Sequence, residues 1–216
     1  MEKIISPLFQ NLTDAEWSEL SGANCLRVRR FARNAIIFHA GDTVYETGIV
    51  LSGSVNIEAS DLLGNKSILS NIQPGGVFAE TYAFCREPMM VDAVSVLPSE
   101  VLFLNLELLT GVYAGTAWAS KILQNMLHIS IHKNLTLSTR ILCTTPKTIR
   151  GRLLIYLSAQ AAKRHSPDFQ IPFNRQQLAD YLNLDRSALS KELGKMRDEG
   201  ILEFHKNHFI LHQLPE

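Results

Sequence analysis

Two segments of the sequence carry side chains whose types and spacing suit chemistry. In Pro74–Glu80 a proline and two glycines precede a carboxylate, an order that favours a tight turn beside a small ligand. In Asn174–Gly200 basic and hydroxyl side chains recur at helical spacing, an arrangement that suits contact with a polyanion. Different elements must position these two sets of side chains, since the first segment follows strand-like sequence and the second is expected to lie on short helices.

The second segment has the start and stop signals of two short helices joined by a sharp turn. Asn174 with Gln177 predicts a capped start, and Asn183 suits a left-handed backbone at the turn. Asp185 is expected to cap a second helix that ends at Gly200. Apolar residues that give the two helices a common buried side are Leu178, Ala179, Leu182, Leu189, Leu193 and Met196. This pattern predicts a helix-turn-helix, in which the small alanine lets the helices pack closely.

The second predicted helix has a polar face opposite its apolar one. Its members are Arg186, Ser187, Ser190, Lys191 and Lys195. Such side chains can contact base edges while their charges neutralise phosphates. Residues 201–212 then predict two short strands around Lys206-Asn207, which form a hairpin wing. The alternative is a helical hairpin used for packing, with an ordinary solvated surface. Against it, the helix caps, the turn, the apolar face and the wing hairpin all fall at the positions that a winged helix-turn-helix requires.

The first 110 residues predict a mainly β domain behind a helical start. Residues 1–30 are expected to be helical, with a capping box at Thr13 and Glu16. Five β-rich runs follow, at 35–40, 47–53, 54–60, 66–72 and 100–106. Turn signals separate them at Gly41-Asp42, Ser52-Gly53, Gly64-Asn65 and Pro74-Gly75. This alternation predicts an antiparallel sandwich or small barrel.

Residues 110–145 predict a helix of about 30 residues, well above the usual mean of about 11–12. The side chains that step along it by three or four residues are Trp118, Ile122, Met126, Ile129 and Lys133. We expect this helix to lie along its own domain and to pair with a second copy, although its irregular apolar spacing gives no heptad register. Thr145-Pro146 is expected to open a further amphipathic helix. The C-terminal third therefore predicts a separate domain, hinged near residues 143–146.

The chain is formally neutral, yet its charges are unevenly distributed. Residues 1–110 carry 7 Lys/Arg against 13 Asp/Glu, a net −6, whereas residues 111–143 carry 3 against 0, a net +3. Residues 144–216 carry 11 against 8, again a net +3, together with four of the seven histidines. An acidic N-terminal part joined to a basic C-terminal part is consistent with a polyanion that binds only the C-terminal part.

Several classes of protein are disfavoured by what the sequence lacks. The first ten residues do not resemble a signal peptide, and no apolar run is long enough to cross a bilayer. Cys25, Cys85 and Cys143 are widely spaced, with no CxxC and no histidines at zinc or iron–sulfur spacing. No nucleophile–base pair or paired carboxylates point to an enzyme. We therefore expect a soluble, cytoplasmic, non-enzymatic protein whose cysteines are small buried hydrophobes.

Over essentially the whole chain, these motifs resemble the CRP/FNR family. Its members are dimeric bacterial transcription regulators such as the catabolite activator protein and the fumarate–nitrate reduction regulator. The segments FHAGD (38–42), VLSGSV (50–55) and PGGVFAE (74–80) look like the turns of the family's β-roll. The resemblance implies an α+β fold with three parts. These are an antiparallel, jelly-roll-like, effector-sensing β-roll of cyclic-nucleotide-binding type with flanking helices (1–110), a long dimerisation helix and hinge (111–145), and a DNA-binding winged helix-turn-helix (146–216).

The resemblance also assigns roles on the recognition helix. Arg186 occupies a guanine-reading position, where it can contact O6 and N7 together. Ser187 stands where glutamate is frequent, so the family's best-known half-site is not expected. Lys191 replaces a frequent arginine and keeps the charge without the planar fork. The positions that match the family's phosphate contacts are Asn174, Arg175 and Gln176.

The effector pocket implied by the resemblance departs from the family's pattern for cyclic nucleotides. That pattern is Gly-Glu followed by Arg-Ser or Arg-Thr, and here the positions read Ala79-Glu80 and Met89-Met90. Because a phosphodiester buried against methionine lacks its counter-charge, cAMP is not the expected effector. The residues that remain for the pocket are Glu80, Tyr82, Phe84, Met89 and Met90. They suit an apolar ligand such as the aromatic acids or phenols that some relatives bind, or they simply fill the core.

Metal-based effectors of the family find little support in the sequence. The iron–sulfur type needs an N-terminal cysteine cluster, where this chain has only Cys25. His39, His128 and His132 are isolated histidines, which are more often surface residues than haem ligands. No metal or cofactor is therefore predicted.

The predicted function is a homodimeric, sequence-specific DNA-binding regulator controlled by a small effector other than cAMP. Its expected partners are a palindromic double-stranded operator, a second copy of the chain, an unidentified effector and RNA polymerase, without a membrane. Two alternatives stay open: a ligand-binding regulatory module that acts through a protein partner, and a cAMP-type nucleotide-responsive regulator. Retained, steeply salt-dependent binding to random duplex DNA would argue against the first alternative.

Overall fold

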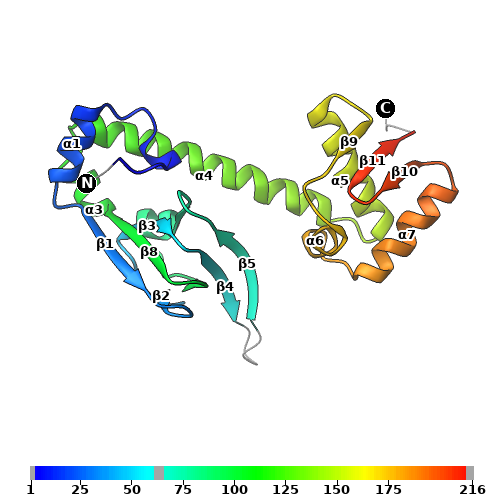
Figure 1. The fold of residues 1–216 in the computed structure, drawn as a ribbon, viewed down its shortest axis with the longest axis horizontal. Coiled ribbons are helices and arrows are strands. Elements are labelled where there is room, and N and C mark those ends of the chain that lie inside the picture. The colour runs from blue at the N-terminus through cyan, green and yellow to red at the C-terminus, as the bar shows by residue number, and fades with distance from the viewer. Residues whose placement is uncertain (1–2, 61–65, 213–216) are drawn as a thin grey trace. The chain divides into compact units, whose positions relative to one another are not determined.

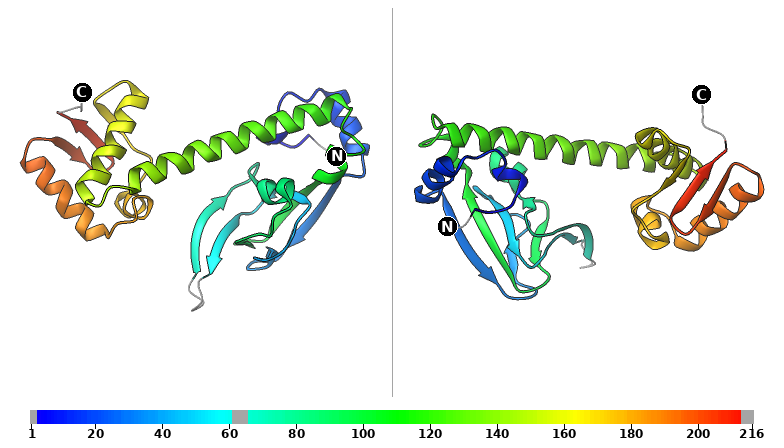
Figure 2. Two further views of the ribbon diagram at one scale, coloured as in Figure 1. Left: turned by 180° about the vertical axis from the view of Figure 1, so that it is seen from behind. Right: turned by 45° about the horizontal axis from the view of Figure 1, so that its top comes forward.

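The computed structural model describes residues 3–60 and 66–212 and divides the chain into two units, Met1–Ile131 and His132–Glu216. Figure 1 and Figure 2 show a β-rich N-terminal part, a long helix, and a C-terminal part built of helices and a small sheet. The first unit has two hydrophobic clusters and the second has its own. Among the described residues, no helix combines the length and apolar character that a membrane crossing requires.

The strands of the N-terminal unit form two four-stranded antiparallel sheets. The first has the order β1 (Leu26–Phe31), β8 (Ser99–Asn105), β3 (Glu46–Ser52) and β6 (Val77–Phe78). The second has the order β2 (Ile36–Phe38), β7 (Asp92–Ser95), β4 (Val55–Ser60) and β5 (Lys66–Ile72). Side chains of both sheets share one buried cluster, to which Phe78 and Phe103 contribute from the first sheet and Val55 and Ala93 from the second. The predicted antiparallel β-roll is confirmed.

All five predicted strands are present, as β2, β3, β4, β5 and β8. Three of the predicted turns have the left-handed glycine that such turns need, at Gly41, Gly53 and Gly75, with φ of 94°, 82° and 84°. The fourth predicted turn, Gly64-Asn65, lies outside the described residues. Strands β1, β6 and β7 were not predicted, because they are short or lack regular alternation and are held by pairing with distant strands.

The prediction of a helix throughout the first 30 residues is only partly right. A 3-10 turn covers Pro7–Phe9, and α1 covers Asp14–Gly22 with the predicted capping box of Thr13 and Glu16. Leu26–Phe31 is instead the edge strand β1. Its pairing partner β8 lies far along the sequence, so local propensity was overridden by a tertiary contact.

The long helix α4 spans Ala117–Thr144, after the short helix α3 (Leu106–Thr110) and a turn. It therefore begins seven residues later than predicted, but its 28 residues match the expected length. Trp118, Ile122 and Met126 are buried in the N-terminal core. The opposite face of the helix is apolar and exposed at Leu127, Ile131, Leu135 and Leu142. A helix with two apolar faces, one of them uncovered, is unusual for a protein that acts as a single chain.

The C-terminal unit contains three helices that follow α4, together with a three-stranded sheet. Its elements are α5 (Ile149–Arg164), β9 (Asp168–Gln170), α6 (Arg175–Tyr181), α7 (Arg186–Asp198), β10 (Leu202–His205) and β11 (His208–Leu211). The sheet order is β10-β11-β9, so the predicted wing hairpin gains a third strand that was not predicted. All six apolar residues predicted for the helix-turn-helix are buried. The winged helix-turn-helix is thus confirmed.

The start of α5 differs from the prediction. Thr148, not Thr145, is its N-cap, and the Thr148 hydroxyl accepts a hydrogen bond from the Gly151 N–H at 3.0 Å. The Thr145 hydroxyl instead donates to the Ile141 carbonyl at 2.7 Å, because α4 continues to Thr144 and offers its last carbonyls there.

The segment predicted as a hinge is tied to the C-terminal unit. Cys143 is 1% exposed and belongs to the core of that unit. Three residues on, the Pro146 carbonyl accepts a hydrogen bond from Arg152 Nε at 2.8 Å. Residues 143–146 are therefore held by packing at one end and by a charged hydrogen bond at the other.

The three cysteines do not share one environment. Cys25 and Cys143 are buried as predicted, but Cys85 is exposed, because it ends the surface helix α2 (Glu80–Cys85). Burial raises the pKa of the Cys25 and Cys143 thiols, which disfavours the reactive thiolate.

Candidate nucleic-acid interface and effector pocket

The N-terminus of α7 is fixed by its cap. The Asp185 carboxylate accepts a hydrogen bond from the Ala188 N–H at 2.8 Å and another from the Ser187 hydroxyl. These bonds, that of Ser187 foremost, lower the pKa of Asp185. The Ser187 donor is thus engaged with the cap, so this residue can offer only its oxygen lone pairs to a further partner.

The predicted polar face of α7 is present and open to solvent. Its exposed members are Arg186, Ser187, Ser190, Lys191 and Lys195. On the other side Leu189, Leu193 and Met196 are completely buried. The helix therefore holds one face in the core and presents three cationic side chains and two hydroxyls on the other, which suits a major groove.

The helix before it, α6, begins with a reciprocal capping box. The Asn174 side chain accepts from the Gln177 N–H, and the Gln177 side chain accepts from the Asn174 N–H, both at 2.9 Å. Gln176 is exposed and donates to the Asp180 carboxylate at 2.8 Å. After α6, Asn183 adopts the predicted left-handed conformation with φ of 52°. Of the three predicted phosphate contacts on α6, Asn174 and Gln176 therefore lie exposed at its first turn.

Two arginines that were not predicted as functional hold the turn between α6 and α7. Arg140, in the last turns of α4, donates from Nε to the Tyr181 carbonyl at 3.2 Å. Arg152, in α5, donates from Nη1 to the carbonyls of Leu182 at 2.9 Å and Asn183 at 3.0 Å. The orphan carbonyls at the end of α6 thus receive charged donors from two other helices, which fixes the turn.

A third arginine ties α5 to the recognition helix. Arg150 donates from Nε to Glu192 at 2.6 Å and from both terminal nitrogens to Glu199 at 2.7 and 2.8 Å. The hydrogen bond from Arg150 holds the pKa of the Glu199 carboxyl below its usual range. No local pattern predicts that Arg140, Arg150 and Arg152 hold α6 and α7, because the partners that they contact there lie 30 or more residues away.

In the N-terminal unit, the residues predicted for an effector pocket separate into two groups. Glu80 is 4% exposed at the start of α2, Met89 is 3% exposed, and Tyr82 packs half-buried against the same core. Phe84 and Met90 are instead 56% and 81% exposed, so they do not share the buried surroundings of the other three residues. Pro88 forms an isolated bridge with Thr43, and Met89 donates to the Asp42 carbonyl at 2.9 Å, before the chain bends at residues 90–91. Met89 is thus held against the core, whereas Met90 lies exposed in the bend.

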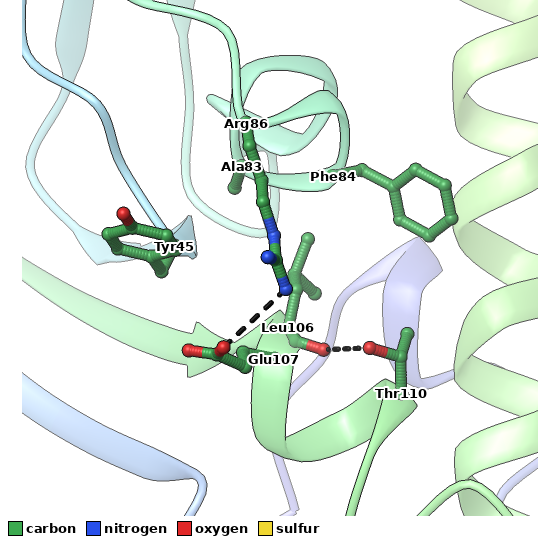
Figure 3. Close-up of a pocket in the computed structure, with 7 residues that line it drawn as sticks. All are labelled: Tyr45, Ala83, Phe84, Arg86, Leu106, Glu107 and Thr110. Atoms are coloured by element: carbon green, nitrogen blue, oxygen red, sulfur yellow. Dashed lines mark hydrogen bonds and ion pairs between the residues drawn. The ribbon is translucent and has the colours of Figure 1, made fainter.

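Phe84 lines a shallow surface pocket of about 160 Å³ beside α2 (Figure 3). The other residues around it are Tyr45, Ala83, Arg86, Leu106, Glu107 and Thr110. Arg86 Nη2 lies 3.5 Å from a Glu107 carboxylate oxygen, and the Thr110 hydroxyl donates to the Leu106 carbonyl at 2.8 Å. The polar groups of Arg86, Glu107 and Thr110 thus already have protein partners, which limits what these three residues can offer a ligand.

Comparison with protein families agrees with this geometry in both halves of the chain. A cyclic nucleotide-binding domain model matches residues 28–115, and a Crp-like helix-turn-helix domain model matches residues 151–216. The two matches cover most of the sequence in the order in which CRP/FNR regulators combine these domains. The chain belongs to the CRP/FNR family. Members of this family are DNA-binding transcription regulators, not enzymes, and their cyclic nucleotide-binding domain receives the effector.

Solved structures share the fold of this CRP/FNR protein at low sequence identity. The catabolite activator protein of Thermus thermophilus is 21% identical with a TM-score of 0.53, over 96% of this chain and 94% of that one. CprK complexed with OCPA is 14% identical with a TM-score of 0.63, over 87% of both chains. The c-di-GMP responsive regulator CLP of Xanthomonas campestris is 18% identical with a TM-score of 0.53, over 88% and 95%. No match was found among curated proteins.

The family's pocket pattern helps to explain one strained residue. Ala79 has a left-handed φ of 62° and precedes the buried Glu80, at the position where the resemblance expects glycine. A left-handed alanine is strained, because its Cβ approaches the neighbouring carbonyl oxygen. This chain therefore has a left-handed backbone at the position where the resemblance expects glycine, but carries alanine there.

Ala79→Gly is expected to raise the free energy of unfolding by about 0.5–1 kcal/mol, since relief of strain exceeds the entropic cost of glycine. Denaturant unfolding measures the change. Ala114→Gly is the control, because Ala114 is an exposed loop residue without a positive φ, and it should show no gain. A loss of stability for Ala79→Gly equal to that of the control would contradict the assignment of strain.

Proposed function

We propose that this CRP/FNR regulator is a cytoplasmic homodimer that reads a palindromic operator through the exposed face of α7. The single observation that carries the proposal is the division of α7 into a fully buried apolar face and an exposed face of Arg186, Ser187, Ser190, Lys191 and Lys195. Arg186 reads a guanine, the lysines neutralise phosphates, and Asn174 and Gln176 contact the backbone at the start of α6. RNA polymerase is proposed as the protein partner at the promoter.

The test is selection of bound sequences from random duplexes by the full-length protein, followed by a salt titration of the selected site. We expect a two-fold symmetric motif whose half-site centres lie about one helical turn or a multiple of it apart. The affinity should fall steeply with salt, as counterion release requires. Failure to enrich any motif, or weak salt dependence, would contradict the proposal and favour a winged domain that serves as a protein interface.

For the effector, we propose a small apolar molecule other than cAMP, bound beside Glu80, Tyr82 and Met89. The support is chemical: Glu80 places one carboxylate in this core, whereas buried Met89 gives no counter-charge to a cyclic phosphate. One neighbour in structure, CprK, is described in complex with OCPA, so a protein of this fold binds a molecule that is not named as a cyclic nucleotide. Calorimetric titration with cAMP should show no binding, and native mass spectrometry of the purified protein should show any co-purified ligand.

The proposed domain roles follow the three segments of the chain. Residues 1–110 sense the effector, 111–145 carry the dimer interface and the coupling to the DNA-binding part, and 146–216 bind DNA. Arg140 supports this division, because it bonds the last turns of α4 to the carbonyl end of α6. An effector changes operator affinity only if it binds the two states of the dimer with different affinity.

A further inference from the structure

Arg175 differs from the other residues at the start of α6, because its guanidinium is turned toward the wing. The Arg175 guanidinium carbon lies 5.0 Å from the ring centroid of Phe204 in β10 and 5.9 Å from that of Phe209 in β11. Its Nη2 donates to the Lys206 carbonyl in the wing turn at 3.3 Å. One side chain of α6 thus contacts both strands of the hairpin and the turn that joins them.

The ring of Phe204 is also approached from the recognition helix. The guanidinium carbon of Arg197, near the end of α7, lies 5.9 Å from its centroid. Phe204 in turn stacks on Phe209 with 6.1 Å between centroids. The wing is therefore attached to both helices of the helix-turn-helix by cation–π contacts, each of which gains strength where water is excluded.

The environment of Arg175 is partly desolvated. Burial, and after it the positive charge of Arg186, lower the pKa of the Arg175 guanidinium. By contrast, Lys206 is exposed at the tip of the wing, where it adopts a left-handed φ of 56°. Of these two cations Lys206 is the exposed one, whereas Arg175 is half-buried and already donates a hydrogen bond to the wing turn.

We propose that Arg175 is a positioning residue that fixes the wing against α6 and α7, and that Lys206 makes the phosphate contact at this corner. Arg175 then does not itself make the phosphate contact that the resemblance implies, but acts on DNA binding through the position of the wing. Its planar guanidinium stacks on the two rings and donates to the carbonyl of the wing turn. The proposal rests on the proposed DNA-binding function. A flat stacking surface and a fork of donors are properties of arginine that lysine lacks.

The experiment compares operator affinity and its salt dependence for the full-length wild type, Arg175→Lys, Phe204→Leu and Lys206→Ala. We expect Arg175→Lys and Phe204→Leu each to weaken binding by about 3- to 30-fold, the range of one or two cation–π contacts, while the salt slope stays unchanged. Lys206→Ala should lower the salt slope by about one. Hydrogen exchange of residues 202–211 should accelerate in Arg175→Lys and Phe204→Leu and stay unchanged in Lys206→Ala.

A double-mutant cycle tests whether Arg175 acts by positioning Lys206 or contacts the DNA itself. If Arg175 acts through the wing tip, Arg175→Lys should have little further effect in the Lys206→Ala background. Wild-type affinity and wild-type exchange for Arg175→Lys would overturn the proposal, since a plain charge would then suffice. Additive effects in the cycle would also overturn it. Absence of specific DNA binding by the wild type itself would instead contradict the proposed function.

Discussion

Replacement of Arg186 by alanine is expected to relax the sequence preference of the protein at one base pair of each half-site and to weaken operator binding. Arg186 is the first residue of α7 and is exposed, while the cap of Asp185 and the buried face of the helix fix its position. A bidentate contact to guanine contributes about 1–3 kcal/mol of discrimination, so preference at that position should fall by roughly 5- to 150-fold. The measurement is affinity for the selected operator and its single-base variants.

Two further variants separate the contribution of positive charge to affinity from the recognition of the base. Arg186→Lys keeps the charge and loses the planar fork, so it should lose the base preference but retain more of the overall affinity. Lys191→Ala should weaken binding about equally for all sequences and reduce the salt slope by about one, as expected of a phosphate contact. An unchanged selected motif for Arg186→Ala would show that α7 does not enter the groove with this end.

The helix-turn-helix could be predicted almost completely from sequence because its signals are local. The capping box of Asn174 and Gln177, the left-handed Asn183 and the Asp185 cap all act within three or four residues of the groups that they satisfy. The apolar spacing then fixes which face of each helix is buried. Where each short-range preference agrees with the fold, sequence alone identifies the candidate interface.

The residues that hold this interface in place could not be predicted in the same way. Arg140, Arg150 and Arg152 act on carbonyls or carboxylates 30 or more positions away, and their own surroundings in the sequence look like ordinary helix. Strand β1 was mistaken for helix for the same reason, since its partner is distant. Long-range pairing of this kind leaves no periodic signal in a single sequence.

The pocket shows a different limit of sequence analysis. Met89 and Met90 are alike in type, yet the first is buried beside the Pro88 bridge and the second is exposed where the chain bends. The pocket motif could be located by resemblance, but the local backbone conformation decides which of its residues are buried. Glu80, Tyr82 and Met89 thereby become the residues to vary in a search for the effector, whereas Met90 serves as an exposed control.

The largest effect of all is expected when a charge is placed on the exposed face of α4. The stripe of Leu127, Ile131, Leu135 and Leu142 runs along the side of the helix opposite its buried residues. Helical spacing of 3.6 residues per turn puts all four on one face, which we propose as the seam of the homodimer. Leu135, 61% exposed in the single chain, should become buried in the dimer.

Leu135→Glu should therefore convert the dimer to a monomer, since the two-fold axis brings the new carboxylates close together in an apolar seam. Sedimentation velocity at micromolar concentration measures the change. Affinity for a palindromic operator should fall at least a hundredfold, because the second half-site is no longer bound within one molecule. Thr136→Glu is the matched control: it adds the same charge one residue further, about 100° round the helix and off the stripe, and should stay dimeric. A dimer that survives Leu135→Glu, or one lost equally in Thr136→Glu, would place the seam elsewhere.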